Sequence, residues 1–238
     1  MMDKRKADDR FRTEFDWLDS RHSFSFGHHY DPAILGFGPL RVINEDWIAP
    51  RSGFPAHPHR EMEILTYVLS GTLSHLDSEE NEARIRPRRS QLMHAGTGIA
   101  HAELNLGDDP VHLLQIWIEP DTPRTSPGHE MIDFALAPGV PTVLASSGAS
   151  AGGLSLRQDA IVSALVLAEG QSFGWSLGER RRGWIQVAHG TGRVDGIDFE
   201  AGDGFAIEEV DRLEIEAVES AELLLFDLPG EGVAAAVK

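Results

Sequence analysis

The sequence predicts an all-β protein built from two β-sandwich or jelly-roll barrels in tandem. Short runs typical of strands follow one another along most of the chain, separated by turn residues such as Gly, Pro, Asn and Asp. Sustained 3.6-residue periodicity, which would indicate amphipathic helices, is nearly absent. Many short strands at close spacing are typical of sandwiches and barrels. Because the pattern repeats, we expect two domains, residues 1–125 and 126–238.

Each predicted strand is a run of β-branched, aromatic or other apolar residues that ends at turn residues. In the first half these runs occupy residues 40–48, 63–70, 72–77, 90–95, 101–106 and 111–120. In the second half they occupy residues 154–160, 163–170, 183–190, 193–199, 204–209, 211–218 and 221–228. The stretch 121–153 is rich in Pro, Gly, Ser and Ala, so we expect it to be the crossover between the two domains.

Two pairs of segments indicate an internal repeat. TYVLSGTL (66–73) resembles IQVAHGTGRV (185–194), and LLQIWIEP (113–120) resembles LLLFDLP (223–229). Both members of a pair take the same relative place in their halves. The first half is longer between these landmarks, where it contains HAGTGIAHAEL (94–104), so we expect it to be the functional copy.

Composition excludes several classes of function. The formal net charge of -17 opposes close approach to phosphate backbones, so we do not expect a nucleic-acid partner. The absence of Cys excludes disulfides, thiolate metal ligands and cysteine nucleophiles, and it fits a reducing compartment. The N-terminal segment has no apolar signal-peptide core, and no run approaches the ~18 apolar residues of a membrane span. We therefore expect a cytoplasmic protein with no membrane partner.

The segment FPAHPHREMEILTYVLSGTL (54–73) raises the possibility of a metal site. In a strand, residues i and i+2 share a face, so His57 and His59 can point to the same side. His101 and Glu103 repeat this spacing. Two such strands can surround a cation with three imidazoles and a carboxylate. The alternative is that His57 and His59 lie in an exposed loop and that His101 caps a turn.

Imidazole and carboxylate ligands suit a divalent first-row metal, namely Fe, Mn, Co, Ni, Cu or Zn, whereas Mg and Ca prefer more oxygens. Four ligands on a six-coordinate ion leave two positions for water, substrate or O2. Zn could instead occupy a closed four-coordinate site. Glu61 and Glu63 are separated from His57 and His59 by an even number of positions, so along a strand they could face the same site. The identity of the carboxylate ligand is therefore open at this point.

Several segments together resemble the pirin family of the cupin superfamily, and in particular bacterial pirin-like quercetinases. In the first half they are WLDSRHSFSFGHHYDP, LRVINEDWI, HPHREMEILTYVLSGTLSHLDS, HAGTGIAHAELN and LLQIWIEP. RRGWIQVAHG and LLLFDLP extend the resemblance through the second half. The resemblance implies a bicupin fold with a metal-binding N-terminal cupin domain and a C-terminal cupin domain without metal ligands.

The resemblance also implies which carboxylate binds the metal. Common cupins take the acid from their first motif, which corresponds to Glu63, whereas pirins take it from the later H-x-E, which corresponds to Glu103. The implied metal ligands are therefore His57, His59, His101 and Glu103. Glu63 is then a supporting acid.

The pirin resemblance implies a quercetin 2,3-dioxygenase that cleaves a flavonol with O2 and releases carbon monoxide. It would use one divalent transition metal per chain, with iron as the first expectation, and Glu103 would be the catalytic base. The expected partners are a small aromatic substrate and O2. Side chains expected near the mouth of the site are Phe24, Phe26, Phe37, Phe54 and Met62. Two alternatives are an iron-responsive regulatory protein that binds a protein partner, and a cupin-type small-molecule isomerase or binding module.

The other histidines are not predicted to form a second metal site. His22, His28 and His29 lie in a segment that resembles the pocket-covering segment of the family. His75, His94 and His112 are expected to be strand residues, with His94 the best candidate of the three to support the metal centre. In the second half SLGERRRGW (176–184) stands in place of the H-x-H motif, so we expect one metal per chain.

Overall fold

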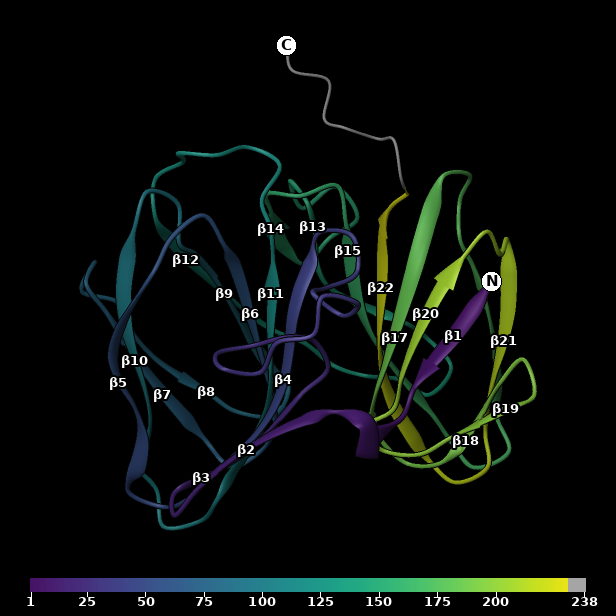
Figure 1. Ribbon diagram of the computed structural model, residues 1–238, viewed down its shortest axis with the longest axis horizontal. Helices are drawn as coiled ribbons and strands as arrows, with labels where there is room; N and C mark the ends of the chain where they lie inside the picture. Colours follow the sequence, from purple (N-terminus) through teal and green to yellow (C-terminus); the bar gives the residue numbers. More distant parts are fainter. Residues whose placement is uncertain (231–238) are drawn as a thin grey trace. The chain divides into compact units, whose positions relative to one another are not determined.

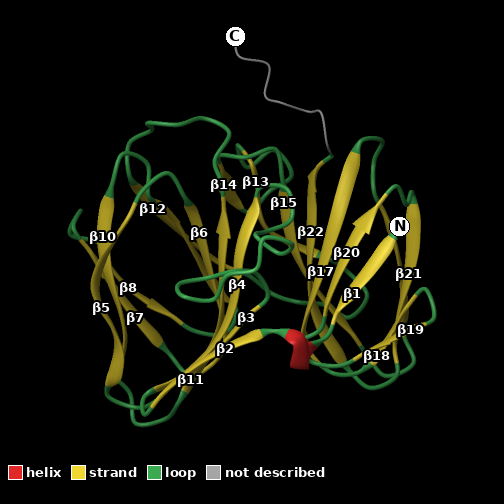
Figure 2. Cartoon of the chain, viewed as in Figure 1, coloured by secondary structure: helices red, strands yellow, loops and turns green. Residues whose placement is uncertain are grey.

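The computed structural model describes residues 1–230, which form β-strands and one short 3-10 helix (Figure 2). This confirms the prediction of an all-β protein. Residues 231–238, at the end of the second predicted domain, lie outside the described residues. Within residues 1–230, no helix has the length and apolar character needed to cross a membrane.

Contacts divide the described chain into two compact units. The N-terminal unit contains residues 11–134 and 154–158. The C-terminal unit contains residues 1–10 and 135–153 and the described residues from 159 on. Figure 1 shows strands in both units. The predicted domain boundary between residues 125 and 126 stays a prediction, because contact grouping does not define independently folding domains.

The N-terminal unit is a sandwich of two antiparallel sheets (Figure 1). One sheet has the strand order β12-β9-β6-β11-β4-β3-β2, and the other has the order β5-β10-β7-β8. The strands of these sheets are β2 (Phe11–Phe15), β3 (Leu18–His22), β4 (Leu40–Ile48), β5 (Ser52–His59), β6 (Glu63–Ser70), β7 (Leu73–Asp77), β8 (Glu82–Ile85), β9 (Arg89–His94), β10 (Ile99–Asn105), β11 (Val111–Ile118) and β12 (Gly128–Asp133). The short strand β14 (Leu154–Leu156) also groups with this unit but lies in neither sheet.

An apolar cluster joins the two sheets of this unit. Ile48 of β4 and Val68 of β6 pack with Leu73 of β7 and Ile85 of β8, and all four side chains are buried. Such burial of apolar surface between facing sheets is the main stabilising contribution in a sandwich. One end of the interior is polar instead, because the buried residues of β10 alternate and include His101 and Glu103.

The C-terminal unit also contains two antiparallel sheets. Within this unit, the strands of one sheet follow the order β1-β20-β17-β22-β15-β13, and those of the other follow the order β16-β21-β18-β19. Its elements are β1 (Met2–Arg5), the 3-10 helix η1 (Ala7–Asp9), β13 (Thr142–Ser147), β15 (Ile161–Leu167), β16 (Ser172–Ser176), β17 (Arg181–His189), β18 (Gly192–Val194), β19 (Ile197–Phe199), β20 (Gly204–Glu208), β21 (Arg212–Ala217) and β22 (Ala221–Pro229). Buried apolar residues of both sheets form its core.

The N-terminal residues group with the C-terminal unit for a local reason. Strand β1 pairs with β20, with Met2 opposite Ile207. Lys4 Nζ lies 2.7 Å from the Oδ2 atom of the fully buried Asp203, and the backbone N–H of Ala7 donates to Asp203 Oδ1 over 2.8 Å. Residues 1–10 are thereby fixed to this unit by backbone pairing and by a buried carboxylate.

The structure corrects two of the predicted segments. The predicted strand 193–199 is a hairpin, β18–β19, because Asp195 and Gly196 have φ values of 45° and 78° and form the turn. Asp-Gly is a preferred pair for a two-residue hairpin turn, which needs positive φ at both positions. The predicted crossover 121–153 contains strands β12 and β13. The many Pro and Gly residues around these two short strands indicated a loop instead.

Candidate metal centre

Strands β5 and β10 position the predicted ligands. The two strands pair antiparallel, with His101 opposite His57 and Glu103 opposite Phe54. The register shifts between these two pairs, because β5 has one more residue between them than β10 has, and such an extra residue is a β-bulge. A bulge changes which side chains face inward. Here it brings Phe54 to the same cavity as His57, despite their odd spacing.

Gly53 permits the close pairing of β5 with β10 beside the bulge. Its φ is +152°, and a Cβ atom at this position would lie 2.3 Å from the carbonyl oxygen of Glu103. Only glycine avoids that clash. A local backbone requirement therefore determines the approach of the strand that contains His57 and His59 to the strand that contains His101 and Glu103.

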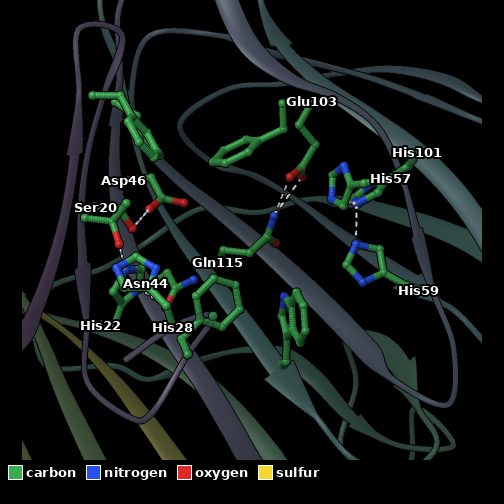
Figure 3. Close-up of a pocket in the computed structure, with 17 residues that line it drawn as sticks. Ser20, His22, His28, Asn44, Asp46, His57, His59, His101, Glu103 and Gln115 are labelled. Atoms are coloured by element: carbon green, nitrogen blue, oxygen red, sulfur yellow. Dashed lines mark hydrogen bonds between the residues drawn. The ribbon is translucent and has the colours of Figure 1, made fainter. Parts of the chain in front are cut away.

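Three of the four predicted ligands form a tight cluster. His101 Nε2 lies 3.1 Å from His57 Nε2 and 2.9 Å from His59 Nε2. His101 is buried, whereas His57 and His59 are partly exposed. Glu103 belongs to a second, overlapping group with His101 and His75. Thus the structure brings the three imidazoles together, and Glu103 lies beside them on β10, the strand that contains His101 (Figure 3).

The protonation states of the cluster fit a cation. Pro55 has a carbonyl oxygen 2.8 Å from His57 Nδ1, and a carbonyl can only accept, so His57 carries its proton on Nδ1. Burial lowers the pKa of His59 to about 4, and burial together with the neighbouring imidazoles lowers the pKa of His101 to about 2. His59 and His101 are therefore neutral at neutral pH, which is the form that binds a metal.

A buried network determines the tautomer of His101. Hydrogen bonds, chiefly from Asn81, lower the pKa of Asp77 although burial alone would raise it, so Asp77 is ionised and accepts from His75 Nε2 at 3.2 Å. His75 Nδ1 then accepts from Gln91 Nε2 at 3.2 Å and from His101 Nδ1 at 3.3 Å. With its proton on Nδ1, His101 directs the lone pair of Nε2 toward the cluster.

When His57 is neutral, its Nε2 atom and that of His101 face each other with their lone pairs, only 3.1 Å apart. No hydrogen bond can form between two acceptors. A cation that both nitrogens bind would relieve this repulsion, and imidazole nitrogens suit divalent transition metals. The side chains of this chain thus fit a metal ion.

Asp77→Asn is expected to weaken metal binding by roughly 10- to 100-fold, the usual effect of removing a group that orients a ligating histidine. The amide can donate to His75 Nε2, which reverses the tautomers of His75 and of His101. Metal affinity is measured by competition with a chelator. Asp108→Asn is the matched control, because it makes the same chemical change in an exposed acid that pairs with Arg51. Equal metal affinity of Asp77→Asn and the wild type would contradict the role of this hydrogen-bond network.

Glu103 is held by a polar group of β11. Gln115 Nε2 donates to both carboxylate oxygens of Glu103, at 2.8 and 2.7 Å (Figure 3). Gln115 Oε1 accepts from Thr66 Oγ1 at 3.0 Å, which determines the orientation of the amide. Burial raises the pKa of Glu103 to about 7 against the hydrogen bond from Gln115. This carboxylate is positioned at the cavity and binds a proton more tightly than an exposed one.

Glu63, the alternative carboxylate, has other partners. Its Oε2 atom lies 2.7 Å from His94 Nδ1 and accepts from the backbone N–H of Arg157 at 3.1 Å. Neither Glu63 nor His94 lines the cavity. The histidine that contacts the cluster is His75, so the expectation that His94 supports the metal centre is wrong.

A cavity of about 340 Å³ opens onto the cluster. His57, His59, His101 and Glu103 line it, together with aromatic side chains. Of the side chains expected at its mouth, Phe26 and Phe54 line it, whereas Phe24, Phe37 and Met62 do not. Trp117 also lines it and contacts His59 edge to face, with ring centroids 4.8 Å apart. The walls therefore suit a flat aromatic ligand.

Asp46 is a second buried acid on the cavity wall, and burial raises its pKa to about 7 from an ordinary 3.8. The folded protein therefore binds this proton more tightly than the unfolded chain, and the resulting stability falls as pH rises through 7. We expect the unfolding free energy of metal-free wild type to fall by about 2 kcal/mol more than that of Asp46→Asn between pH 5 and pH 8. Urea unfolding of both proteins at each pH measures this difference.

Asp133→Asn, which alters an exposed acid paired with Arg89, is the control for this measurement. It is expected to follow the wild type over the same range. Parallel pH profiles for Asp46→Asn and the wild type would contradict the raised pKa.

The N-terminal histidines form a separate polar group. His22 Nδ1 donates to Asn44 Oδ1 at 2.8 Å, and His22 Nε2 accepts from Thr13 Oγ1 at 2.9 Å. His28 lines the cavity. In residues 1–230, the clusters with metal-ligand geometry are His57–His59–His101 and His75–His101–Glu103, and neither includes an N-terminal histidine.

Sequence reasoning missed three polar residues of this centre: Gln115, Asp46 and Asp77. One signal was available, because Gln115 interrupts the apolar strand VHLLQIWI and Asp46 ends the polar triplet NED within a mostly buried strand. Buried polar residues in such strands require partners. Asp77 gave no such signal, because a strand-terminal Asp is common in turns.

Comparison with known proteins identifies the family of this chain. The family model described as Pirin matches residues 4–118, and the model described as "Quercetinase C-terminal cupin domain" matches residues 143–228. Quercetin 2,3-dioxygenase of Escherichia coli K12 is 42% identical over 226 residues, which cover 94% of this chain and 97% of that protein. The chain belongs to the pirin family.

Solved pirin structures share the fold. The crystal structure of YhhW from Escherichia coli superimposes with a TM-score of 0.93 at 40% identity, covering 97% of this pirin and 98% of that chain. The nickel(II) complex of bacterial pirin YhhW gives a TM-score of 0.92 at 40% identity, covering 97% and 100%. The tandem cupin fold and the pirin resemblance are thus confirmed. The nickel belongs to that relative, and iron in this pirin stays a prediction.

Proposed function

We propose that this pirin is a metal-dependent dioxygenase that cleaves a flavonol such as quercetin with O2. The observation that carries the proposal is the cluster of three imidazoles at an aromatic-lined cavity, with the Nε2 atoms of His57 and His101 facing each other at 3.1 Å. Such a cluster suits a metal with open positions. The name of the Escherichia coli relative, quercetin 2,3-dioxygenase, supports the reaction.

Under this proposal His57, His59, His101 and Glu103 hold one divalent transition metal, with iron as the first expectation. When bound, the metal lowers the pKa of a coordinated substrate hydroxyl and stabilises the anion that forms. The protein contributes the orientation of the ligands. The hydrogen bonds of His57 Nδ1 to Pro55 and of His101 Nδ1 to His75 keep both Nε2 atoms available.

Glu103 is proposed as the base that accepts the hydroxyl proton of the flavonol. In the metal-free protein, burial raises the pKa of Glu103 to about 7, so the ionised form there is a better proton acceptor than an exposed carboxylate. Gln115 holds the carboxylate through both oxygens, so the group stays directed at the cavity. Phe26, Phe54 and Trp117 enclose the ring system and limit access of water.

Metal-loaded full-length protein is expected to consume quercetin and O2 in equal amounts and to release carbon monoxide. Flavonol absorbance, an oxygen electrode and gas analysis measure the three quantities, and chelator-treated protein is the control. Quercetin that binds but persists in air would overturn the proposal and favour a binding module. The regulatory alternative predicts a protein partner whose binding changes with the metal.

A further inference from the structure

The cavity has a second polar end that the proposed reaction does not use. Ser20 and His22 of β3 and Asn44 and Asp46 of β4 line this end. Figure 3 shows these four side chains on the opposite side of Gln115 from the three histidines of the metal centre. A ligand bound at the metal centre therefore extends toward a second set of hydrogen-bonding groups.

The backbone register directs these side chains to one place. Ser20 pairs with Asp46, and His22 pairs with Asn44, so each pair lies on the same face of neighbouring strands. Glu45, between the two β4 residues, points to the other face, where His112 Nε2 lies 2.8 Å from its carboxylate. Alternation along β4 thus separates two neighbouring acids, and only Asp46 lines the cavity.

Asp46 is incompletely paired within the described residues. It is 4% exposed, and its Oδ1 atom accepts a hydrogen bond from the hydroxyl of Ser20. No described side chain or backbone group donates to its Oδ2 atom, which Figure 3 shows directed into the cavity. A ligand that covers this oxygen and removes it from water has to supply a hydrogen bond in exchange, because a buried polar atom without a partner is unfavourable.

The chemistry of Asp46 selects the ligand group. Ser20 occupies Oδ1, so Oδ2 presents either a proton donor or an acceptor to the cavity, depending on ionisation. A phenolic hydroxyl matches both forms, because it can donate to the carboxylate and accept from the carboxyl group. A second carboxylate would be repelled by Asp46 and by Glu103, whose pKa Asp46 raises in part. The aromatic walls favour a ring as the bearer of the hydroxyl.

We propose that Asp46, held by Ser20, is a specificity-determining residue that binds a phenolic hydroxyl of the ligand at the end remote from the metal centre. The inference rests on the proposed function in one respect, namely that oxygen atoms at the other end of the ligand bind the metal. It narrows the substrate class to aromatic compounds with hydroxyl groups at both ends.

A matched pair of ligands tests this assignment. Quercetin has hydroxyl groups on its outer rings, whereas 3-hydroxyflavone has only the metal-binding hydroxyl and carbonyl. Dissociation constants are measured without O2 on metal-loaded full-length protein, so that no turnover occurs. Asp46→Ala is expected to weaken quercetin binding by roughly 10-fold or more and 3-hydroxyflavone binding by less than about 2-fold. Asp46→Asn, which keeps a hydrogen-bonding group, should restore most of the quercetin affinity.

Glu45→Ala is the matched control, because Glu45 is the adjacent acid on the opposite face of the same strand, where it contacts His112 and not the cavity. It should change the affinity for neither ligand. Equal weakening of both ligands by Asp46→Ala, or unchanged quercetin affinity, would overturn the role of Asp46. The role of Asp46 would also be overturned if the wild-type protein bound quercetin no more tightly than 3-hydroxyflavone, or bound neither flavonol. Asp46-dependent binding of quercetin that is not oxidised when O2 is added would overturn the dioxygenase proposal alone.

Discussion

His101→Ala is expected to remove nearly all bound metal and, with it, the oxygen-dependent loss of quercetin. His101 lies at the centre of the cluster, because its Nε2 atom contacts both His57 and His59. Loss of a group that merely orients a ligand weakens metal binding by roughly 10- to 100-fold, so loss of the ligand itself should exceed roughly 100-fold. Elemental analysis of metal per chain after dialysis against a chelator measures the effect.

His189→Ala is the control for this variant. His189 is an exposed histidine at the end of β17 in the C-terminal unit, and its removal should leave the metal content unchanged. Circular dichroism of His101→Ala separates loss of the site from loss of the fold. A folded His101→Ala protein that retains a full equivalent of metal would show that the cluster is not the metal site.

Glu103→Gln is expected to lower activity by roughly 100- to 10,000-fold, the usual contribution of a positioned general base. The amide keeps the size of the side chain but loses the negative charge and the ability to take a proton. Weaker metal binding should accompany the loss, because a neutral amide is a poorer ligand for a divalent ion. Turnover of quercetin and metal affinity are measured on the same preparation.

Glu63→Gln is the matched variant, since it makes the same chemical change in the acid that common cupins use. Glu63 accepts from Arg157 and contacts His94 away from the cavity, so its variant should keep the metal and lose thermal stability. Full metal and activity in Glu103→Gln would overturn the assignment of Glu103. Loss of metal in a folded Glu63→Gln protein would make Glu63 the ligand.

Strands with strong local signals were predictable. The predicted segments 40–48 and 63–70 coincide with β4 and β6, because both are mostly apolar and lie in the middle of a sheet. Strand β5 was harder to recognise, because Pro55 and Pro58 interrupt it. Proline is tolerated there since β5 is the edge strand of its sheet. The prediction of one strand over 193–199 was wrong, because the Asp-Gly pair in its middle forms the turn of a hairpin.

The sequence by itself determined the donors of the candidate site and the faces they share. His57 with His59, and His101 with Glu103, are two residues apart, and a strand alternates its side chains whatever surrounds it. The same residues supported the family resemblance, so the tandem barrels and the choice of Glu103 over Glu63 could be expected without coordinates.

Only the tertiary structure decided which polar groups meet. The bulge between β5 and β10, the contact of His75 with His101, the hydrogen bonds of Gln115 to Glu103 and the position of Asp46 on the cavity wall each depend on how separate strands pair or face each other. Cross-strand neighbours depend on register and on how two sheets face each other, which no local pattern encodes. The two-residue spacing therefore revealed each pair of donors, whereas the packing of the strands placed the histidines, the acids and the aromatic side chains around one cavity.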